Sequence, residues 1–348
     1  MQPQLNVLPI EKDIWHSNLQ EFSHSIFMLP QWLGVVETAK RIPIFFDFIK
    51  NNQIVAKASG LIIKDNQIKG KQLFFYAGPA LRKDDAELYN QCLNSLRFYA
   101  QRNGFSRIQI FYFDNRIHHR PNVSYYHSYP MNEAVINLQS DYKQFKPGSS
   151  LRKKRNTAIR VQTTIFESKD EKMIKRLCEL TENTRIRRMK RHNSDYHKLS
   201  FPYFNEEHVP KLLKSGIANM YCSMNPDGTT HFIALVIEHN KSVYGLFNGC
   251  DDYGYQFGLP GYTILKNSIE YQEKGFERFN LGGVPASRNE KGKLLQFKEE
   301  IGGITQTIYV AKTDFLIYPF KAFNPLINIA RKLPYNRVSR ILTRLLRY

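Results

Sequence analysis

The stretches Gly104-Phe105-Ser106-Arg107 and Gly275-Phe276-Glu277-Arg278 differ at a single position, and each lies between an expected helix and an expected strand. A glycine just after a helix commonly adopts the left-handed conformation, which costs other residues free energy. The matched stretches therefore predict that the same helix-to-strand junction is used twice, and that the chain contains a repeated unit.

The segments before the two junctions follow the same order. In each half, β-branched and aromatic runs separated by turn sequences predict three strands, and helical spacing predicts the helix that leads into the junction. The first half has expected strands at 44–49 and 54–63, a strand ending at 78–79, a helix at 85–101 and a strand at 108–113. The second half has expected strands at 218–224, 230–237 and 243–248, a helix at 262–272 and a strand at 279–281. These patterns favour a duplicated α+β unit, although two such common patterns can also coincide by chance.

The length of 348 residues corresponds to about two domains, and 42% hydrophobic residues exclude a disordered chain. We expect a first domain at 1–145 and a second at 146–314. The second begins with a basic segment, 146–191, whose pattern is mostly helical. The remaining residues, 315–348, form a separate tail.

The charge of the chain is strongly basic, since 50 Lys and Arg against 31 Asp and Glu give a net charge of +19. This favours a polyanionic partner, which RNA, DNA, an anionic membrane or a phosphate-bearing substrate could each be. The four cysteines form no C-x-x-C pair, so no zinc site or disulfide framework is indicated. The chain also lacks a secretory signal pattern and an apolar run of about 18 residues. We expect a cytoplasmic protein, with peripheral attachment to the inner face of the membrane as an option.

Several motifs of covalent and metal-dependent enzymes are absent from the sequence. There is no G-x-S-x-G elbow, no Walker loop and no H-E-x-x-H pair. Their absence disfavours serine hydrolases, ATPases and zinc hydrolases. Transfer of an acyl group to an amine needs none of them, because positioning and stabilisation of the oxyanion suffice.

The second half ends with Phe279-Asn280-Leu281-Gly282-Gly283, followed by Leu295-Gln296-Phe297-Lys298-Glu299-Glu300-Ile301-Gly302-Gly303. With Leu29-Pro30-Gln31-Trp32, the basic helix 151–158 and Thr184-Arg185-Ile186-Arg187, this resembles the FemABX family of peptidoglycan bridge-forming aminoacyltransferases. The resemblance implies an α+β chain of two tandem GNAT-like domains, with mixed sheets flanked by helices and a cleft between them. Two departures are Asn280, where the family usually has Asp, and Ile301, where it has an aromatic residue.

The resemblance also implies a catalytic pair, Lys298 and Phe297. Lys298 would stabilise the charge that develops on the reacting carbonyl, from a place at the edge of the second sheet, and Phe297 would stack on a base. A solvated lysine and a core phenylalanine are the structural alternatives. If Lys298 is catalytic, its loss is expected to slow turnover most while leaving the fold intact.

The expected donor site lies where GNAT enzymes hold the coenzyme A pyrophosphate, in the loop 254–261 before a helix. Its candidate residues are Gly282, Gly283, Gly258, Gly261, Tyr262 and Asn248. The spacing of this loop departs from the coenzyme A pattern by one residue, and a plain turn or loop is the alternative. No cofactor is expected, since aminoacyl-tRNA or acyl-coenzyme A would act as a co-substrate.

Acceptor and phosphate binding is expected at Trp32, Lys40, Arg152, Arg155 and Arg187. The resemblance places the acceptor at the first two residues, and the density of Arg and Lys around the other three suits phosphates. A solvated helical face is the alternative for the arginines, and plain core packing is the alternative for Trp32.

The tail holds Lys321, Arg331, Lys332, Arg337, Arg340, Arg344 and Arg347, with no acidic residue after Asp314. Apolar residues lie between these basic ones, which is typical of a helix at an anionic membrane surface. A helix that docks on the protein's own core is the alternative.

Together these observations predict an acyltransferase that moves an aminoacyl or acyl group onto an amine of an acidic cell-envelope or peptidoglycan-precursor acceptor. The first alternative is an acyl-coenzyme A-dependent N-acyltransferase on the same scaffold. The second is a non-catalytic RNA-binding protein. The sequence does not distinguish the two donors.

Overall fold

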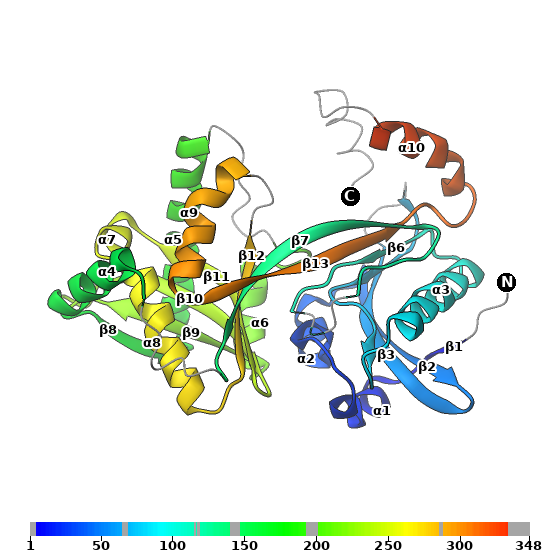
Figure 1. The fold of residues 1–348 in the computed structure, drawn as a ribbon, viewed down its shortest axis with the longest axis horizontal. Coiled ribbons are helices and arrows are strands. Elements are labelled where there is room, and N and C mark those ends of the chain that lie inside the picture. The colour runs from blue at the N-terminus through cyan, green and yellow to red at the C-terminus, as the bar shows by residue number, and fades with distance from the viewer. Residues whose placement is uncertain are drawn as a thin grey trace. The chain divides into compact units, whose positions relative to one another are not determined.

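The computed structural model describes residues 5–64, 69–114, 116, 119–139, 147–192, 201–284 and 288–332 (Figure 1). The chain divides into two compact units. Unit 1 takes the described residues of 1–28, 37–129 and 309–348, and unit 2 takes those of 29–36 and 130–308.

The strands of unit 1 are ordered β1-β2-β3-β4-β6, followed by the part of β13 from residue 309 onward. The strands are β1 (Asn6–Pro9), β2 (Arg41–Lys50), β3 (Gln53–Ile63), β4 (Gln72–Phe75), β6 (Arg107–Ile110) and β13 (Gly303–Thr313), and the short β5 (Ala80–Leu81) pairs with β3. The helices are α1 (Lys12–Ser17), α3 (Ala86–Arg102) and α10 (Asn324–Lys332). The pair β4–β6 is parallel and the other pairs are antiparallel, so the sheet is mixed.

Unit 2 repeats this plan, with strands in the order β8-β9-β10-β11-β12, followed by the part of β7 from residue 130 onward. The strands are β7 (Tyr126–Asn137), β8 (Thr164–Ser168), β9 (Ala218–Met224), β10 (Thr230–His239), β11 (Ser242–Cys250) and β12 (Arg278–Val284). The helices are α2 (Pro30–Val36), α4 (Ser149–Arg160), α5 (Glu171–His192), α6 (Val209–Lys214), α7 (Asp252–Gln256), α8 (Leu259–Glu273) and α9 (Arg288–Glu300). Its single parallel pair, β11–β12, corresponds to β4–β6 of unit 1.

The duplicated junction has the same geometry in both units. Gly104 has φ 70° and Gly275 has φ 80°, so both glycines adopt the left-handed conformation. The next residue donates its N–H back into the helix in each case, from Phe105 to the Ala100 carbonyl and from Phe276 to the Tyr271 carbonyl, both at 2.9 Å. The expected repeat, the α+β class and the mixed sheets flanked by helices are confirmed.

The unit boundaries differ from the expected 1–145, 146–314 and 315–348. Strand β7 pairs with β12 and so completes the sheet of unit 2, while the end of β13 pairs with β6 and completes that of unit 1. Helix α2 lies in unit 2 and not with the first repeat, because Trp32 stacks on Phe204 with ring centroids 5.5 Å apart. Each unit thus takes chain segments that are distant in sequence.

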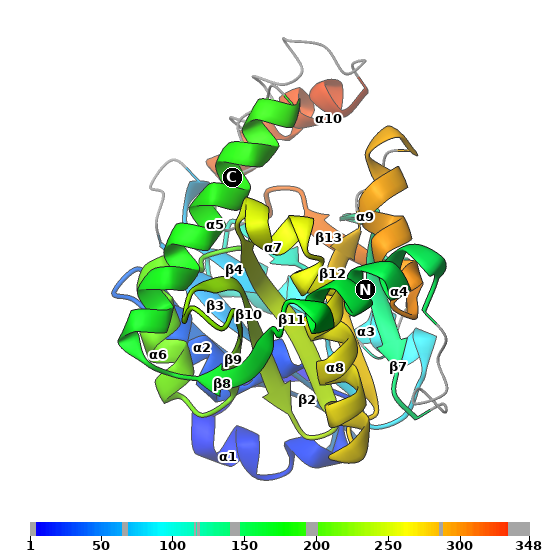
Figure 2. The same ribbon diagram turned by 90° about the vertical axis from the view of Figure 1, so that its left-hand side faces the viewer.

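The helices of unit 2 cover both faces of its sheet. Helix α5 packs on β10 and β11, and Figure 2 shows α8 on the opposite side of these strands. The core on the α8 side includes Ile264 and Tyr271 from α8 and Val243 from β11. The segment 146–191, expected to be mostly helical, also contains strand β8, and the expected loop 254–261 overlaps helices α7 and α8. None of the helices that the structure describes is long and apolar enough to cross a bilayer.

Candidate functional site

The parallel strands β11 and β12 separate partway along their length. They pair at Ser242–Arg278, Val243–Phe279 and Tyr244–Asn280, and no later pair follows. Two residues beyond the last pair, Gly282 adopts φ 77°, and the register of β12 against β7 shifts between Asn280 and Gly283. We call Leu281–Gly283 the glycine bend. The bend turns backbone carbonyl groups of β12 away from its ladder with β11.

Lys298 lies against this bend. Its ammonium nitrogen donates to the carbonyl oxygens of Leu281 at 2.8 Å, Gly282 at 2.9 Å and Gly283 at 2.9 Å. An ammonium group has three N–H donors, so all of them are used. The residue is in the last turn of α9 and only 7% exposed, which does not fit the alternative of a solvated surface lysine. Lys298 holds a fixed, buried positive charge beside the point where β11 and β12 separate.

The burial of Lys298 changes its acid–base behaviour. Loss of solvation lowers the pKa of its ammonium to about 8 from the ordinary value of 10.5. The carboxylate of Glu133 opposes this shift, and the positive charge of Arg188 adds to it. Lys298 therefore titrates close to neutral pH, within the range in which a change of its charge can affect a reaction.

A buried polar network connects the glycine bend to the neighbouring strands. Glu133 on β7 is 2% exposed and accepts hydrogen bonds from the Tyr244 hydroxyl at 2.9 Å and the Asn280 side-chain amide at 2.8 Å. The other end of the Asn280 amide accepts the N–H of Gly282 at 2.8 Å. Because an ionised aspartate has no donor, it could not bond to Glu133 in this way. The network gives a physical reason for an asparagine where FemABX-like sequences have aspartate.

The expected donor loop is covered by the protein itself. A Cβ atom added at Gly258 would collide with the side chain of Lys154, and one added at Gly261 would lie 2.5 Å from Leu151. Both neighbours belong to α4, which therefore packs over the first turn of α8. This is the helix start on which a coenzyme A pyrophosphate was expected to lie. Of the other candidates, Tyr262 packs against the core beside α4, and Asn248 is exposed on β11.

Phe297 packs inward from α9. Its ring is partly buried against the core that contains Leu151 and Ile301, and it faces the position of Gly261. This geometry agrees with the core-packing alternative. Ile301, where the family has an aromatic residue, is completely buried in the same core.

The basic helices α4 and α5 both belong to unit 2. Arg152 is exposed and Arg155 half-buried on α4, and the guanidinium of Arg187 on α5 lies 3.2 Å above the ring of Tyr255. Trp32 is fully buried in unit 2, whereas Lys40 is an exposed residue of unit 1, in the turn closed by Thr38 and Arg41. The burial of Trp32 agrees with plain core packing.

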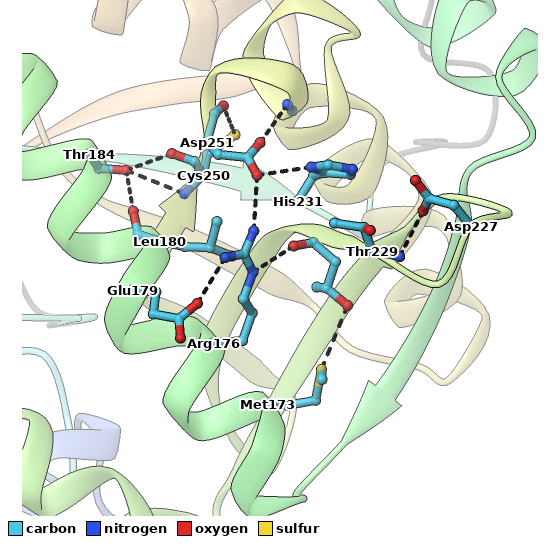
Figure 3. A network of polar contacts seen from close by, with 12 residues as sticks. Met173, Arg176, Glu179, Leu180, Thr184, Asp227, Thr229, His231, Cys250 and Asp251 are labelled. Carbon is cyan, nitrogen blue, oxygen red and sulfur yellow. Dashed lines mark hydrogen bonds and ion pairs between the residues drawn. The ribbon is translucent and has the colours of Figure 1, made fainter.

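A second polar network fastens α5 to the sheet (Figure 3). Arg176 donates to the Thr230 carbonyl at 2.8 Å and to the Asp251 carboxylate at 3.0 Å. Asp251 also lies 2.8 Å from His231 Nδ1, and it caps α7 by accepting the Gly254 N–H. This network connects α5 to the ends of β10 and β11, and so fixes the helix that carries Arg187.

Sequence reasoning did not identify Glu133 or Tyr244. Glu133 directly precedes the apolar run 134–136, and a single acidic residue in such a place carries no recognisable motif. Their importance follows from tertiary contacts alone. Among the described residues, no group of three or more His, Cys, Asp or Glu could hold a metal ion.

No family model and no curated protein matches this sequence. Among solved structures, the chain is similar to FemX, with a TM-score of 0.66 and 12% identity, covering 93% of this chain and 99% of FemX. It is also similar to L-PGS from Bacillus licheniformis, with a TM-score of 0.55 and 14% identity over 86% and 91% of the two chains. A tandem GNAT protein from the clavulanic acid biosynthesis pathway matches with a TM-score of 0.50 and 6% identity, over 90% and 99%. The chain has the tandem GNAT fold seen in FemX, as its motifs predicted.

Proposed function

We propose that this protein transfers an aminoacyl group from aminoacyl-tRNA to an amine of an acidic cell-envelope precursor. The main support is the buried charge of Lys298 at the point where β11 and β12 separate. The fold is like that of FemX. The motif order around Phe297 and Lys298 resembles that of the FemABX family. Peptidoglycan precursors are the acceptor class that the resemblance favours.

In the proposed reaction the acceptor amine attacks the ester carbonyl of the aminoacyl-tRNA. A C–N bond forms, the C–O bond to the terminal ribose breaks, and the ribose hydroxyl gains the proton that the amine loses. Negative charge develops on the carbonyl oxygen in between. Lys298 would stabilise that charge through its field, and release of one of its three carbonyl partners would let it donate directly.

The choice of aminoacyl-tRNA over acyl-coenzyme A rests on helix α4. Its residues Leu151 and Lys154 fill the space over the first turn of α8, at Gly258 and Gly261. A pyrophosphate needs close approach to backbone N–H groups at such a helix start. The same helix exposes Arg152, Lys153 and Lys154, which suit the phosphates of a larger donor.

A transfer assay with two donors tests the proposal. The purified protein would be incubated with amine-bearing peptidoglycan precursors and either radiolabelled aminoacyl-tRNA or radiolabelled acetyl-coenzyme A. We expect label to reach the precursor from aminoacyl-tRNA only, and pretreatment of that donor with ribonuclease to abolish transfer. Transfer from acetyl-coenzyme A, or from neither donor, would contradict the proposal. Binding of tRNA without transfer would favour the non-catalytic RNA-binding alternative.

A further inference from the structure

Helix α10 is attached to the rest of unit 1 by one of its faces. The side-chain amide of Asn324 makes two hydrogen bonds with the backbone of Phe315, both at 2.9 Å. Ile327 is 5% exposed, and Arg331 forms an ion pair with Asp314 at 2.7 Å. Residues 324, 327 and 331 lie on one side of a helix because they are three, four and seven positions apart. This side is the attached face.

The opposite side of the same segment carries exposed apolar residues. Leu326 is 58% exposed and Ile329 is 57% exposed, and Phe323 just before the helix is 44% exposed. We call these three residues the apolar face of α10. Clustered large apolar side chains in water are unfavourable and mark a surface that contacts something else. Because α10 docks on unit 1 through its attached face, the apolar face does not serve as the internal docking surface.

The charge of the surrounding segment indicates what this face contacts. After Asp314 the chain has seven Lys and Arg residues and no Asp or Glu. Lys321, at the start of the apolar face, is exposed, with its ammonium 5.8 Å from the ring of Tyr318, which is 74% exposed. Exposed aliphatic and aromatic side chains beside an excess of basic residues are typical of helices that lie on anionic bilayers. A surface for a neutral protein partner would not need this excess of one charge.

We propose that the apolar face of α10 docks on an anionic lipid bilayer, with the helix lying in the plane of the interface. Leu326, Ile329 and Phe323 would insert below the headgroups, and the exposed Lys321 would contact lipid phosphates. The inference rests on unit 1 and does not depend on the transfer reaction proposed above.

Co-sedimentation with lipid vesicles tests the proposal on the full-length protein. We expect binding to vesicles of phosphatidylglycerol and phosphatidylcholine, weak binding to phosphatidylcholine alone, and a marked loss of binding at high salt. Leu326→Ser combined with Ile329→Ser should weaken binding about tenfold or more, because each side chain contributes apolar burial. Ile14→Ser is the matched control, since Ile14 is 64% exposed on α1 and should have no effect on vesicle binding.

Other occupants of the apolar face give different results in the same variants. If the double variant binds vesicles as the parent does, the proposal is wrong. If the face instead packs against a second copy, the parent would be a dimer in size-exclusion chromatography with light scattering, and the double variant a monomer. If residues 336–348 cover the face, their deletion would raise vesicle binding, whereas a lipid-binding tail predicts that the deletion lowers it.

Discussion

Lys298 donates to three backbone carbonyl groups from a buried position, so its substitution should affect folding as well as any reaction. Lys298→Met leaves these carbonyl oxygens without their donor. We expect the free energy of unfolding to fall by about 1–3 kcal/mol, measured by urea denaturation. Transfer should slow by ~10²–10³, the usual cost of losing one group that stabilises an oxyanion. The expectation from the sequence that loss of Lys298 leaves the fold intact stays a prediction, and the denaturation curves test it.

Lys293→Met is the matched control for this experiment. Lys293 lies on the same helix and is exposed, so its loss should change the free energy of unfolding by no more than about 0.5 kcal/mol. Near-parental transfer by Lys298→Met would leave Lys298 a purely structural residue. If Lys298→Met unfolds with nearly the parental free energy, the three hydrogen bonds of Lys298 contribute little to stability.

The lowered pKa of Lys298 predicts a pH limit on transfer. The charged form predominates below a pKa of about 8, so the rate should fall as the pH rises through that value. Glu133→Gln removes the carboxylate that raises the pKa of Lys298, and this limit should then move to lower pH. The check is a pH–rate profile of the parent and this variant, with the exposed Glu299→Gln as the control. An identical profile for parent and Glu133→Gln would contradict the assignment of the limit to Lys298.

The same shift has a consequence for stability with a definite sign. Between about pH 8 and 10.5 the unfolded chain retains the lysine proton more readily than the folded one. The contribution of Lys298 to the free energy of unfolding should therefore rise with pH across this window. The measurement is the difference in free energy of unfolding between the parent and Lys298→Met, followed as the pH rises through this window.

At the scale of single elements, three glycines at helix ends allow two effects of a substitution to be distinguished. One is the strain of a left-handed backbone, and the other is a steric clash of the added side chain. Gly104 and Gly275 have positive φ and nothing within 4 Å of an added Cβ, whereas at Gly258 the added atom would meet Lys154. Gly104→Ala and Gly275→Ala should each cost about 1–2 kcal/mol, from the left-handed conformation alone. Gly258→Ala should cost more, because α4 must also move. Denaturation curves of the three variants test this, and equal losses would mean that α4 is not held against α8.

The elements that the sequence predicted are those with strong local signals. Helix α3, expected at 85–101, begins after Asp85, whose side chain accepts the N–H groups of Glu87 and Leu88. Strands β8 and β13 were not identified, because their residues alternate poorly between buried and exposed positions. Helix α7 was taken as part of a glycine-rich loop, since it has only five residues.

The candidate site was predicted in part. The order of the motifs located the glycine bend and Lys298, but not their contact, because a helix between them brings the lysine back to the bend. Glu133 and Tyr244 join the site through pairing of β7 with β12 and of β12 with β11, which no local pattern specifies. The covering of α8 by α4 likewise depends on how two distant helices pack.

At the scale of the whole chain, the same fold is built twice with different surfaces. The last strand of the unit 1 sheet, the end of β13, follows the whole of unit 2 in the sequence, whereas β7 leads directly from unit 1 into unit 2. A boundary drawn at the end of the first repeat therefore cannot separate the units. The cleft expected between the domains stays a prediction. Most of the net charge of +19 comes from the basic helices α4 and α5 of unit 2 and from the tail after Asp314.

This division of charge predicts how the protein binds tRNA. If α4 and α5 contact the tRNA backbone, the logarithm of the binding constant should fall linearly with the logarithm of salt concentration, by ~0.7–0.9 for each phosphate neutralised. Arg152→Ala combined with Lys153→Ala removes two exposed charges of α4, and should lower the slope by about one to two units while leaving the fold unchanged. Lys50→Ala combined with Arg102→Ala removes two exposed charges of unit 1 and should leave the slope as it is. The tRNA-binding constants of the parent and of the two double variants would be measured by filter binding across a series of salt concentrations. The prediction fails if the binding constant of the parent does not change with salt concentration, or if the salt slope decreases equally in both double variants. Either result would show that tRNA binding does not depend on the basic helices of unit 2.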